Sequence, residues 1–117
     1  MSLEEAEKIL FKVGHQRYVE HQFRRKKDWI SYSLETIIKA KNYLDNDDKI
    51  WEPDFNNGNE YKYLPYFRFS KEDGWVLGSV YSYCVTSHFS ASYYYKKEDT
   101  ARVMANELIK LYNSYLG

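Results

Sequence analysis

The chain is poor in cysteine, proline and glycine, and it carries no net charge. It has one cysteine, Cys84, among 117 residues, which excludes an internal disulfide and a cysteine-based zinc site. Lysine and arginine together number 17, as do aspartate and glutamate, so the formal net charge is zero. This balance argues against binding of nucleic acid or an acidic membrane by the protein surface as a whole.

Long apolar runs are also missing. No stretch approaches the roughly 18 apolar residues that a membrane helix needs. The first residues, Met-Ser-Leu-Glu-Glu-Ala-Glu, are acidic and do not resemble a signal peptide. We therefore expect no membrane partner and a reducing, cytoplasmic location.

Aromatic residues, in contrast, are abundant. Phe, Trp and Tyr make up 19% of the chain, and 13 of its residues are tyrosine. Because a tyrosine hydroxyl needs a hydrogen-bond partner or water, many of these rings should lie half-buried at the edge of the core or in a binding surface. The length predicts one domain with a modest core, residues 1–117.

The N-terminal part of the chain is typical of helices. Ser2 and Glu5 form a capping box before an apolar stripe that ends near Gly14, and a further short helical segment is expected within residues 15–27. Asp28 is predicted to cap a second helix that ends near Leu44. The acidic segment 45–60, with six acidic residues and one lysine, then forms a loop.

Strand patterns follow this loop. Residues 61–69 alternate and contain Pro65, which predicts an edge strand or a bulge near that residue. Asp73 and Gly74 favour a hairpin turn. A second strand, residues 75–85, is predicted to place Tyr81 and Tyr83 on the same face as Trp75 and Leu77, and a third strand covers 88–96.

An apolar stripe from Ala101 onward predicts a last helix that begins near Glu98. The fold class is therefore α+β: N-terminal helices, a three-stranded antiparallel meander, and a C-terminal helix packed on the apolar face of the sheet.

Catalytic and metal-binding patterns are weak. His15 and His21 are six residues apart, which does not stack two ligands on one helix face, and Cys84 with His88 lacks a third orienting group. An EF-hand register that starts at Asp45 places Lys49 and Ile50 where ligand and glycine are needed. We predict a non-enzyme without catalytic residues, metal or cofactor.

Two sequence blocks carry a resemblance to a known group of proteins. The first reads Trp51-x-Pro53-Asp54-Phe55, and the second reads Glu-Tyr-Lys-Tyr-x-Pro-Tyr-Phe over residues 60–67. With a C-terminal helix of the form Ala, Leu-Ile, Leu-Tyr and Tyr-Leu, the chain resembles small uncharacterised proteins of phages, prophages and mobile elements of Bacteroides-type gut bacteria.

The resemblance covers residues 34–117 and leaves 1–33 as a helical N-terminal extension outside it. Lys97 departs from the polar cap expected before the last helix. The resemblance implies a fold and a source in a phage or mobile element of a bacterial host, and it supplies no catalytic residues.

The first functional hypothesis is a non-catalytic protein-interaction module, in the form of a phage accessory protein that inhibits a host or defence factor. Tyrosine and tryptophan are enriched at interface hot spots. Taken singly, each ring is equally well explained as part of the core or its margin. The candidate binding residues are Trp51, Tyr66, Trp75, Tyr81, Tyr83, Tyr93 and Tyr94.

The alternative hypothesis is a nucleic-acid or nucleotide binder that stacks bases on the sheet aromatics. Its phosphate contacts would come from the basic run Arg24, Arg25, Lys26 and Lys27, together with Arg68, Lys96 and Lys97. A solvated helix face or loop is the simpler explanation of the basic run. A structural or assembly role in the phage particle and a homodimer formed through the exposed side of the sheet are further alternatives.

Overall fold

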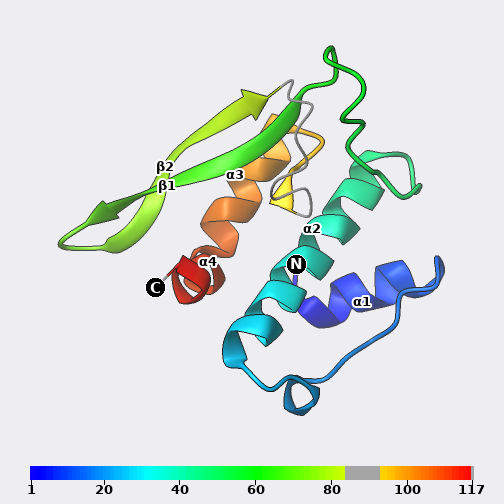
Figure 1. The fold of residues 1–117 in the computed structure, drawn as a ribbon, viewed down its shortest axis with the longest axis horizontal. Coiled ribbons are helices and arrows are strands. Elements are labelled where there is room, and N and C mark those ends of the chain that lie inside the picture. The colour runs from blue at the N-terminus through cyan, green and yellow to red at the C-terminus, as the bar shows by residue number, and fades with distance from the viewer. Residues whose placement is uncertain (84–92, 117) are drawn as a thin grey trace.

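The computed structural model describes residues 1–83 and 93–116 of the chain (Figure 1). It is a mixed α and β fold, as predicted. Its elements are α1 (Leu3–Phe11), a 3-10 turn η1 (Glu20–Gln22), α2 (Lys26–Asp45), β1 (Lys62–Ser70), β2 (Gly74–Tyr83), α3 (Glu98–Glu107) and α4 (Ile109–Leu116).

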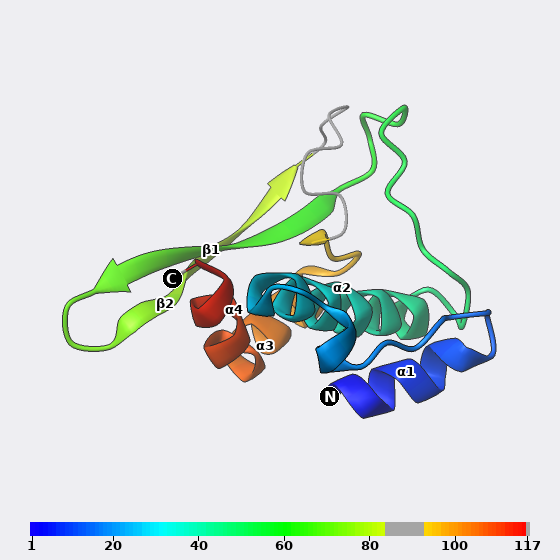
Figure 2. The same ribbon diagram turned by 60° about the horizontal axis from the view of Figure 1, so that its bottom comes forward.

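The elements form layers, with α3 and α4 in the middle. The β1–β2 hairpin lies on one side of these two helices, and α2 followed by α1 lies on the other (Figure 2). The core runs through all layers. Its buried members include Leu10 of α1, Leu34 and Ile38 of α2, Val80 of β2 and Met104 of α3. None of the helices in the described ranges is both long and apolar enough to cross a membrane.

The first helix and its Ser2 N-cap are confirmed, although the helix ends at Phe11. The Ser2 hydroxyl oxygen accepts a hydrogen bond from the Glu5 amide at 3.1 Å, and the helix is followed by Gly14 with φ +84°. A glycine adopts this left-handed conformation without the steric cost of a side chain. The segment after it contains one short helical turn, Glu20–Gln22.

The start of α2 differs from the prediction. Arg25 is the N-cap residue, and Asp28 lies within the first turn. The Asp28 carboxylate accepts two hydrogen bonds from the Arg25 guanidinium, both at 3.1 Å. Asp28 therefore forms an ion pair with Arg25 at the positive end of the helix dipole, and the helix begins at Lys26, two residues before the predicted cap Asp28.

The hairpin turn and the irregularity near Pro65 are confirmed. Gly74 has φ +74°, and the register shifts between Tyr66 and Phe67, opposite Gly78. This bulge overturns the predicted faces of the second strand. An extra residue reverses the alternation of side chains beyond it. Val80 and Leu77 therefore both contact the core, whereas Tyr81 is 51% exposed on the opposite face.

The three-stranded meander is not confirmed. The sheet of the described residues has two strands, and most of the predicted third strand falls on residues 84–92, outside the described ranges. Within residues 93–96, Tyr95 alone forms a bridge with Tyr63. The two backbones exchange hydrogen bonds of 3.0 and 2.7 Å.

Two asparagine side chains take the place of further strands. The Asn42 amide donates to the Tyr94 carbonyl at 2.9 Å and its oxygen accepts from the Lys96 amide at 2.9 Å. Asn113 of α4 bonds the amide and carbonyl of Trp75 in the same way, at 3.1 and 3.3 Å. The helices thereby satisfy polar groups of extended backbone.

The last helix begins at Glu98, as predicted, but it is broken at Leu108 into α3 and α4. Leu108 has φ −99° and ψ 15°, outside regular helix geometry. Because of the break, α3 packs on both strands and α4 packs on β2 and α2. Packing of the C-terminal segment on the sheet is therefore confirmed, with two helices in place of one.

Candidate functional site

The outer face of the hairpin carries a cluster of exposed tyrosines. Tyr66 and Tyr81 meet edge to face with ring centroids 4.7 Å apart, and they are 45% and 51% exposed. Tyr83 lies 6.3 Å from Tyr66, and its hydroxyl donates to the Tyr66 hydroxyl at 2.5 Å. These rings occupy the face that points away from the helices, because the bulge opposite Gly78 turns Tyr81 and Tyr83 outward.

The cluster continues onto the body of the molecule. Tyr83 contacts Tyr94 edge to face at 6.3 Å, and Tyr94 contacts Phe55 at 6.3 Å. We call the connected rings Tyr81, Tyr66, Tyr83, Tyr94 and Phe55 the aromatic strip. The strip joins the flat outer face of the hairpin to a hollow beside α2.

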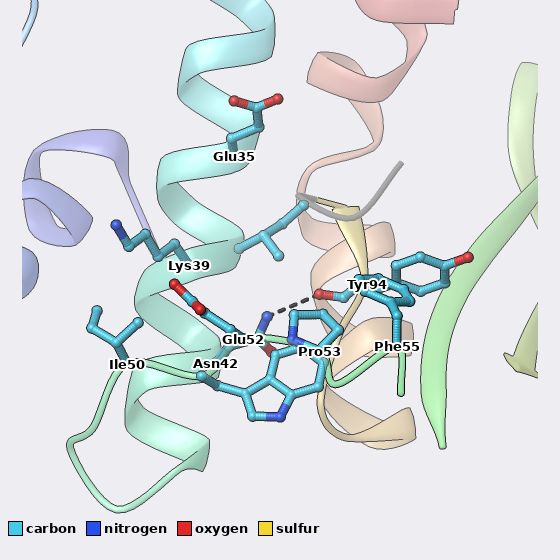
Figure 3. Close-up of a pocket in the computed structure, with 10 residues that line it drawn as sticks. Glu35, Lys39, Asn42, Ile50, Glu52, Pro53, Phe55 and Tyr94 are labelled. Atoms are coloured by element: carbon cyan, nitrogen blue, oxygen red, sulfur yellow. Dashed lines mark hydrogen bonds between the residues drawn. The ribbon is translucent and has the colours of Figure 1, made fainter. Parts of the chain in front are cut away.

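That hollow is a pocket of about 410 Å³ between α2 and residues 50–55 (Figure 3). Lys39 and Glu52 lie at its opening, and Glu35 lies one helical turn before Lys39 along α2. Most of its wall is apolar or aromatic. The lining residues are Glu35, Ile38, Lys39, Asn42, Ile50, Trp51, Glu52, Pro53, Phe55 and Tyr94.

A buried lysine fixes the loop that forms this pocket. The Lys62 side chain is fully buried, and its ammonium lies 5.4 Å from the centre of the Phe55 ring. The same ammonium donates to the Glu60 carbonyl at 3.1 Å and pairs with the Glu60 carboxylate at 3.5 Å. Glu60 in turn accepts from the Asp54 amide at 2.8 Å. Phe55 is therefore held in place by a charge network within the loop.

Two hydroxyls of the strip, those of Tyr83 and Tyr94, are held in the protonated form. Burial, and then the hydrogen bond to Tyr66, raises the pKa of Tyr83 to about 12. Burial also raises the pKa of Tyr94. Each hydroxyl therefore keeps its proton and can donate as well as accept a hydrogen bond. Charged groups next to the strip include the Lys62 ammonium, 5.4 Å from the Phe55 ring centre, and Glu35, Lys39 and Glu52 in the pocket lining.

The structure brings together five of the predicted binding residues. Trp51 and Tyr94 line the pocket, and Tyr66, Tyr81 and Tyr83 lie on the hairpin. Trp75 is separate, because it packs 5.7 Å from Phe69 near the hairpin turn. Tyr93 packs against the core.

The basic run lies apart from these rings. Arg24, Arg25, Lys26 and Lys27 are exposed at the beginning of α2, three helical turns before the pocket residue Lys39. Lys96 is tied to the end of α2, where its ammonium donates to the Asn46 side chain at 2.7 Å. The 24–27 run thus lies apart from the rings, whereas Arg68 is exposed on β1 two residues after Tyr66.

A second polar cluster joins α1 to α2. The Tyr32 hydroxyl donates to the buried Glu7 carboxylate at 2.7 Å, and it lies 3.1 Å from the His15 ring nitrogen. Arg17 pairs with Glu7 at 3.5 Å. Burial, and then the charge of Lys39, lowers the pKa of His15. Sequence spacing gives no signal for this cluster, since Tyr32 is 25 residues from Glu7.

The described residues contain no group of three His, Cys, Asp or Glu side chains that could hold a metal ion. The pair Cys84 and His88 lies outside the described ranges. Comparison with models of known protein families, with curated proteins and with solved structures found no match to the chain. The aromatic strip and its pocket are the candidate site.

Proposed function

We propose that the protein is a non-catalytic interaction module that binds a partner protein through the aromatic strip. The observation that carries this proposal is the continuity of the rings from Tyr81 on the hairpin to Phe55 in the pocket. Tyrosine supplies a large contact area and a hydrogen-bonding tip at a low cost in side-chain entropy, which suits a protein interface. The layered helices behind the hairpin supply a rigid support.

Binding of nucleic acid is the weaker alternative. It requires phosphate-contacting cations beside the stacking rings. Arg68 on β1 supplies a cation beside the rings. The basic run Arg24–Lys27, however, lies at the other end of α2, and the loop beside the pocket carries six acidic residues against one lysine between 45 and 60. A phosphate backbone on the strip would be repelled by that loop.

We further propose the setting in which the module acts. The resemblance to phage and mobile-element proteins and the small size support an accessory protein in the cytoplasm of a bacterial host that inhibits a host or defence factor. An assembly role in the phage particle and a homodimer would use the same exposed tyrosines. A third strand over residues 88–96, of which Tyr95 bridges Tyr63, remains part of the proposed sheet.

Affinity capture with matched variants tests this function. The wild-type protein, the double variant Tyr66→Ala/Tyr81→Ala and the control Phe11→Ala are used to capture proteins from lysates of Bacteroides-type bacteria. Phe11 is 78% exposed on α1, which lies on the far side of the molecule from the hairpin (Figure 1). We expect the double variant to bind the captured partner at least about tenfold more weakly, because each hot-spot ring contributes more than about 1 kcal/mol. Phe11→Ala should bind normally.

Equal capture by the wild type and the double variant would contradict the proposal. A second measurement addresses the alternative directly. Light scattering is recorded at low and high salt with single-stranded oligonucleotides and cyclic nucleotides. Salt-sensitive binding that is lost in Arg24→Ala/Lys26→Ala would favour a nucleic-acid function. We expect no binding in this assay.

A further inference from the structure

The pocket differs from the rest of the strip in shape and charge. The hairpin face is an exposed surface of tyrosine rings, whereas the pocket is a hollow of about 410 Å³ with Glu52 and Lys39 at its opening and Glu35 in its lining. A volume of this size accepts one long side chain or a small ligand. We propose that the pocket receives an arginine side chain from a basic segment of the partner protein. This inference rests on the proposed protein-binding function and names the chemistry of the partner.

The first step of the argument is charge complementarity. Glu52 is exposed at the rim, and among the described residues its carboxylate forms no ion pair. Glu35 and Lys39 contribute opposite charges from the same face of α2. The remaining charge comes from the segment 45–60, where acidic residues outnumber lysine six to one. The opening therefore attracts cations and repels phosphate and carboxylate groups.

The second step is the aromatic wall. Trp51 and Phe55 line the pocket together with Ile38, and the Tyr94 ring packs behind Phe55. A cation over the face of such a ring is stabilised by the ring quadrupole, and tryptophan gives the strongest effect. The chain already uses this interaction next to the pocket, because the Lys62 ammonium lies 5.4 Å from the Phe55 ring centre. The Lys62 charge is itself balanced by Glu60 at 3.5 Å, so the pocket keeps its attraction for a further cation.

The third step selects arginine over lysine. A guanidinium is planar and weakly hydrated, so it stacks on indole and phenol rings with little loss of solvation. Its edge can at the same time donate two parallel hydrogen bonds to a carboxylate such as that of Glu52. An ammonium group is strongly hydrated and would enter the apolar wall at a greater cost. The combination of flat rings inside and the Glu52 carboxylate at the rim therefore matches a guanidinium.

Nuclear magnetic resonance of the tryptophan indoles tests this inference on the full chain. The three tryptophans report on three regions, since Trp51 lines the pocket, Trp29 lies in α2 beside Phe23, and Trp75 lies near the hairpin turn. The probe is a blocked peptide Gly-Gly-Arg-Gly-Gly. Its matched control replaces arginine with citrulline, which has the same shape and no charge. Trp51→Phe assigns the resonance.

We expect the arginine peptide to shift the Trp51 indole signal saturably, with a dissociation constant in roughly the millimolar range that a single cation–π and ion-pair contact supports. The signals of Trp29 and Trp75 should not move. Glu52→Gln should weaken binding about threefold to tenfold, and Glu72→Gln, a matched change at the exposed hairpin turn, should not. Higher salt should weaken binding as well.

Three results would overturn the inference. These are equal binding of the citrulline peptide, a Trp51 shift with adenosine monophosphate in place of the arginine peptide, and no shift with the arginine peptide. The last result leaves the proposed function intact if Tyr66→Ala/Tyr81→Ala still loses the captured partner. Conversely, selective arginine binding together with unchanged capture by that double variant would support the pocket and refute the role of the exposed tyrosines.

Discussion

Asn42 connects α2 to the extended segment around Tyr95 through one side-chain amide. It is 4% exposed, and it bonds the Tyr94 carbonyl and the Lys96 amide. Leucine has a similar size and can neither donate nor accept. Asn42→Leu would therefore leave the buried Tyr94 carbonyl and the Lys96 amide without this partner, and each such group costs about 1–3 kcal/mol when it stays unsatisfied.

We expect Asn42→Leu to lower the free energy of unfolding by about 2–4 kcal/mol in urea titrations. Asn113→Leu is the matched control, because Asn113 makes the same pair of bonds to Trp75 from a half-buried position where water can replace it. Its loss should be smaller, at about 1 kcal/mol. Equal decreases in the free energy of unfolding for the two variants would show that burial of the asparagine does not determine the cost of losing its hydrogen bonds.

Single residues were predictable where their effect is local. Ser2 and Gly74 act on neighbours within three residues, and their cap and turn were predicted correctly. Asn42 forms a hydrogen bond with Tyr94, 52 residues away in the sequence, and Tyr32 forms one with Glu7, 25 residues away. Nothing in the spacing of the chain marks such partners, because only the packed fold brings them together. Lys62, which lies in a strand pattern, was likewise not expected to be buried.

At the scale of elements, the hairpin depends on one glycine and tolerates change at another. Gly74 has φ +74°, a conformation that costs an L-residue about 1 kcal/mol, whereas Gly78 has no positive φ. A Cβ at Gly78 would meet the Tyr66 carbonyl oxygen at 3.4 Å, which is ordinary contact.

We therefore expect Gly74→Ala to lower the free energy of unfolding by about 1 kcal/mol. Gly78→Ala should change it by less than about 0.5 kcal/mol. Thermal and urea unfolding of both variants measure the difference. A larger loss at Gly78 than at Gly74 would mean that the bulge opposite Tyr66, and not the turn, controls the hairpin.

The bulge also explains why the candidate site was only partly predictable. The strands themselves follow from their residues, but the face of each ring depends on register. One extra residue at Gly78 exchanges inside and outside for Tyr81 and Tyr83. The residue types of the strip could be chosen from the sequence, whereas their connection through Tyr94 to Phe55 required the fold.

At the scale of the whole molecule, two buried phenols link the sheet side to the last helix. The hydroxyls of Tyr95 and Tyr112 lie 3.1 Å apart. Burial raises the pKa of Tyr112 to about 12 and raises the pKa of Tyr95 well above its usual value. In the unfolded chain both phenols ionise near pH 10. Their contribution to stability is therefore complete below about pH 10 and is lost as the pH rises toward 12.

We expect the free energy of unfolding to fall steeply between about pH 10 and pH 12, by about 2–3 kcal/mol for Tyr112 alone. Tyr112→Phe removes one ionising group, so its decline should be shallower than that of the wild type. Tyr61→Phe, at a position that is 57% exposed, should leave the decline unchanged. Urea unfolding across this pH range, with phenolate absorbance as a second signal, measures the effect. Identical curves for all three proteins would contradict it.

The central position of α3 and α4 has a consequence for synthesis of the chain. Ribosomes release α1, α2 and the hairpin before these two helices, yet α4 is the element that packs on both α2 and β2. The apolar sides of α2 and the hairpin that pack on α3 and α4 therefore stay exposed to solvent until residues 98–116 leave the exit tunnel. During that interval they can bind chaperones or aggregate. A slow codon in the stretch that encodes residues 98–116 would prolong this vulnerable interval more than one in the stretch that encodes α1.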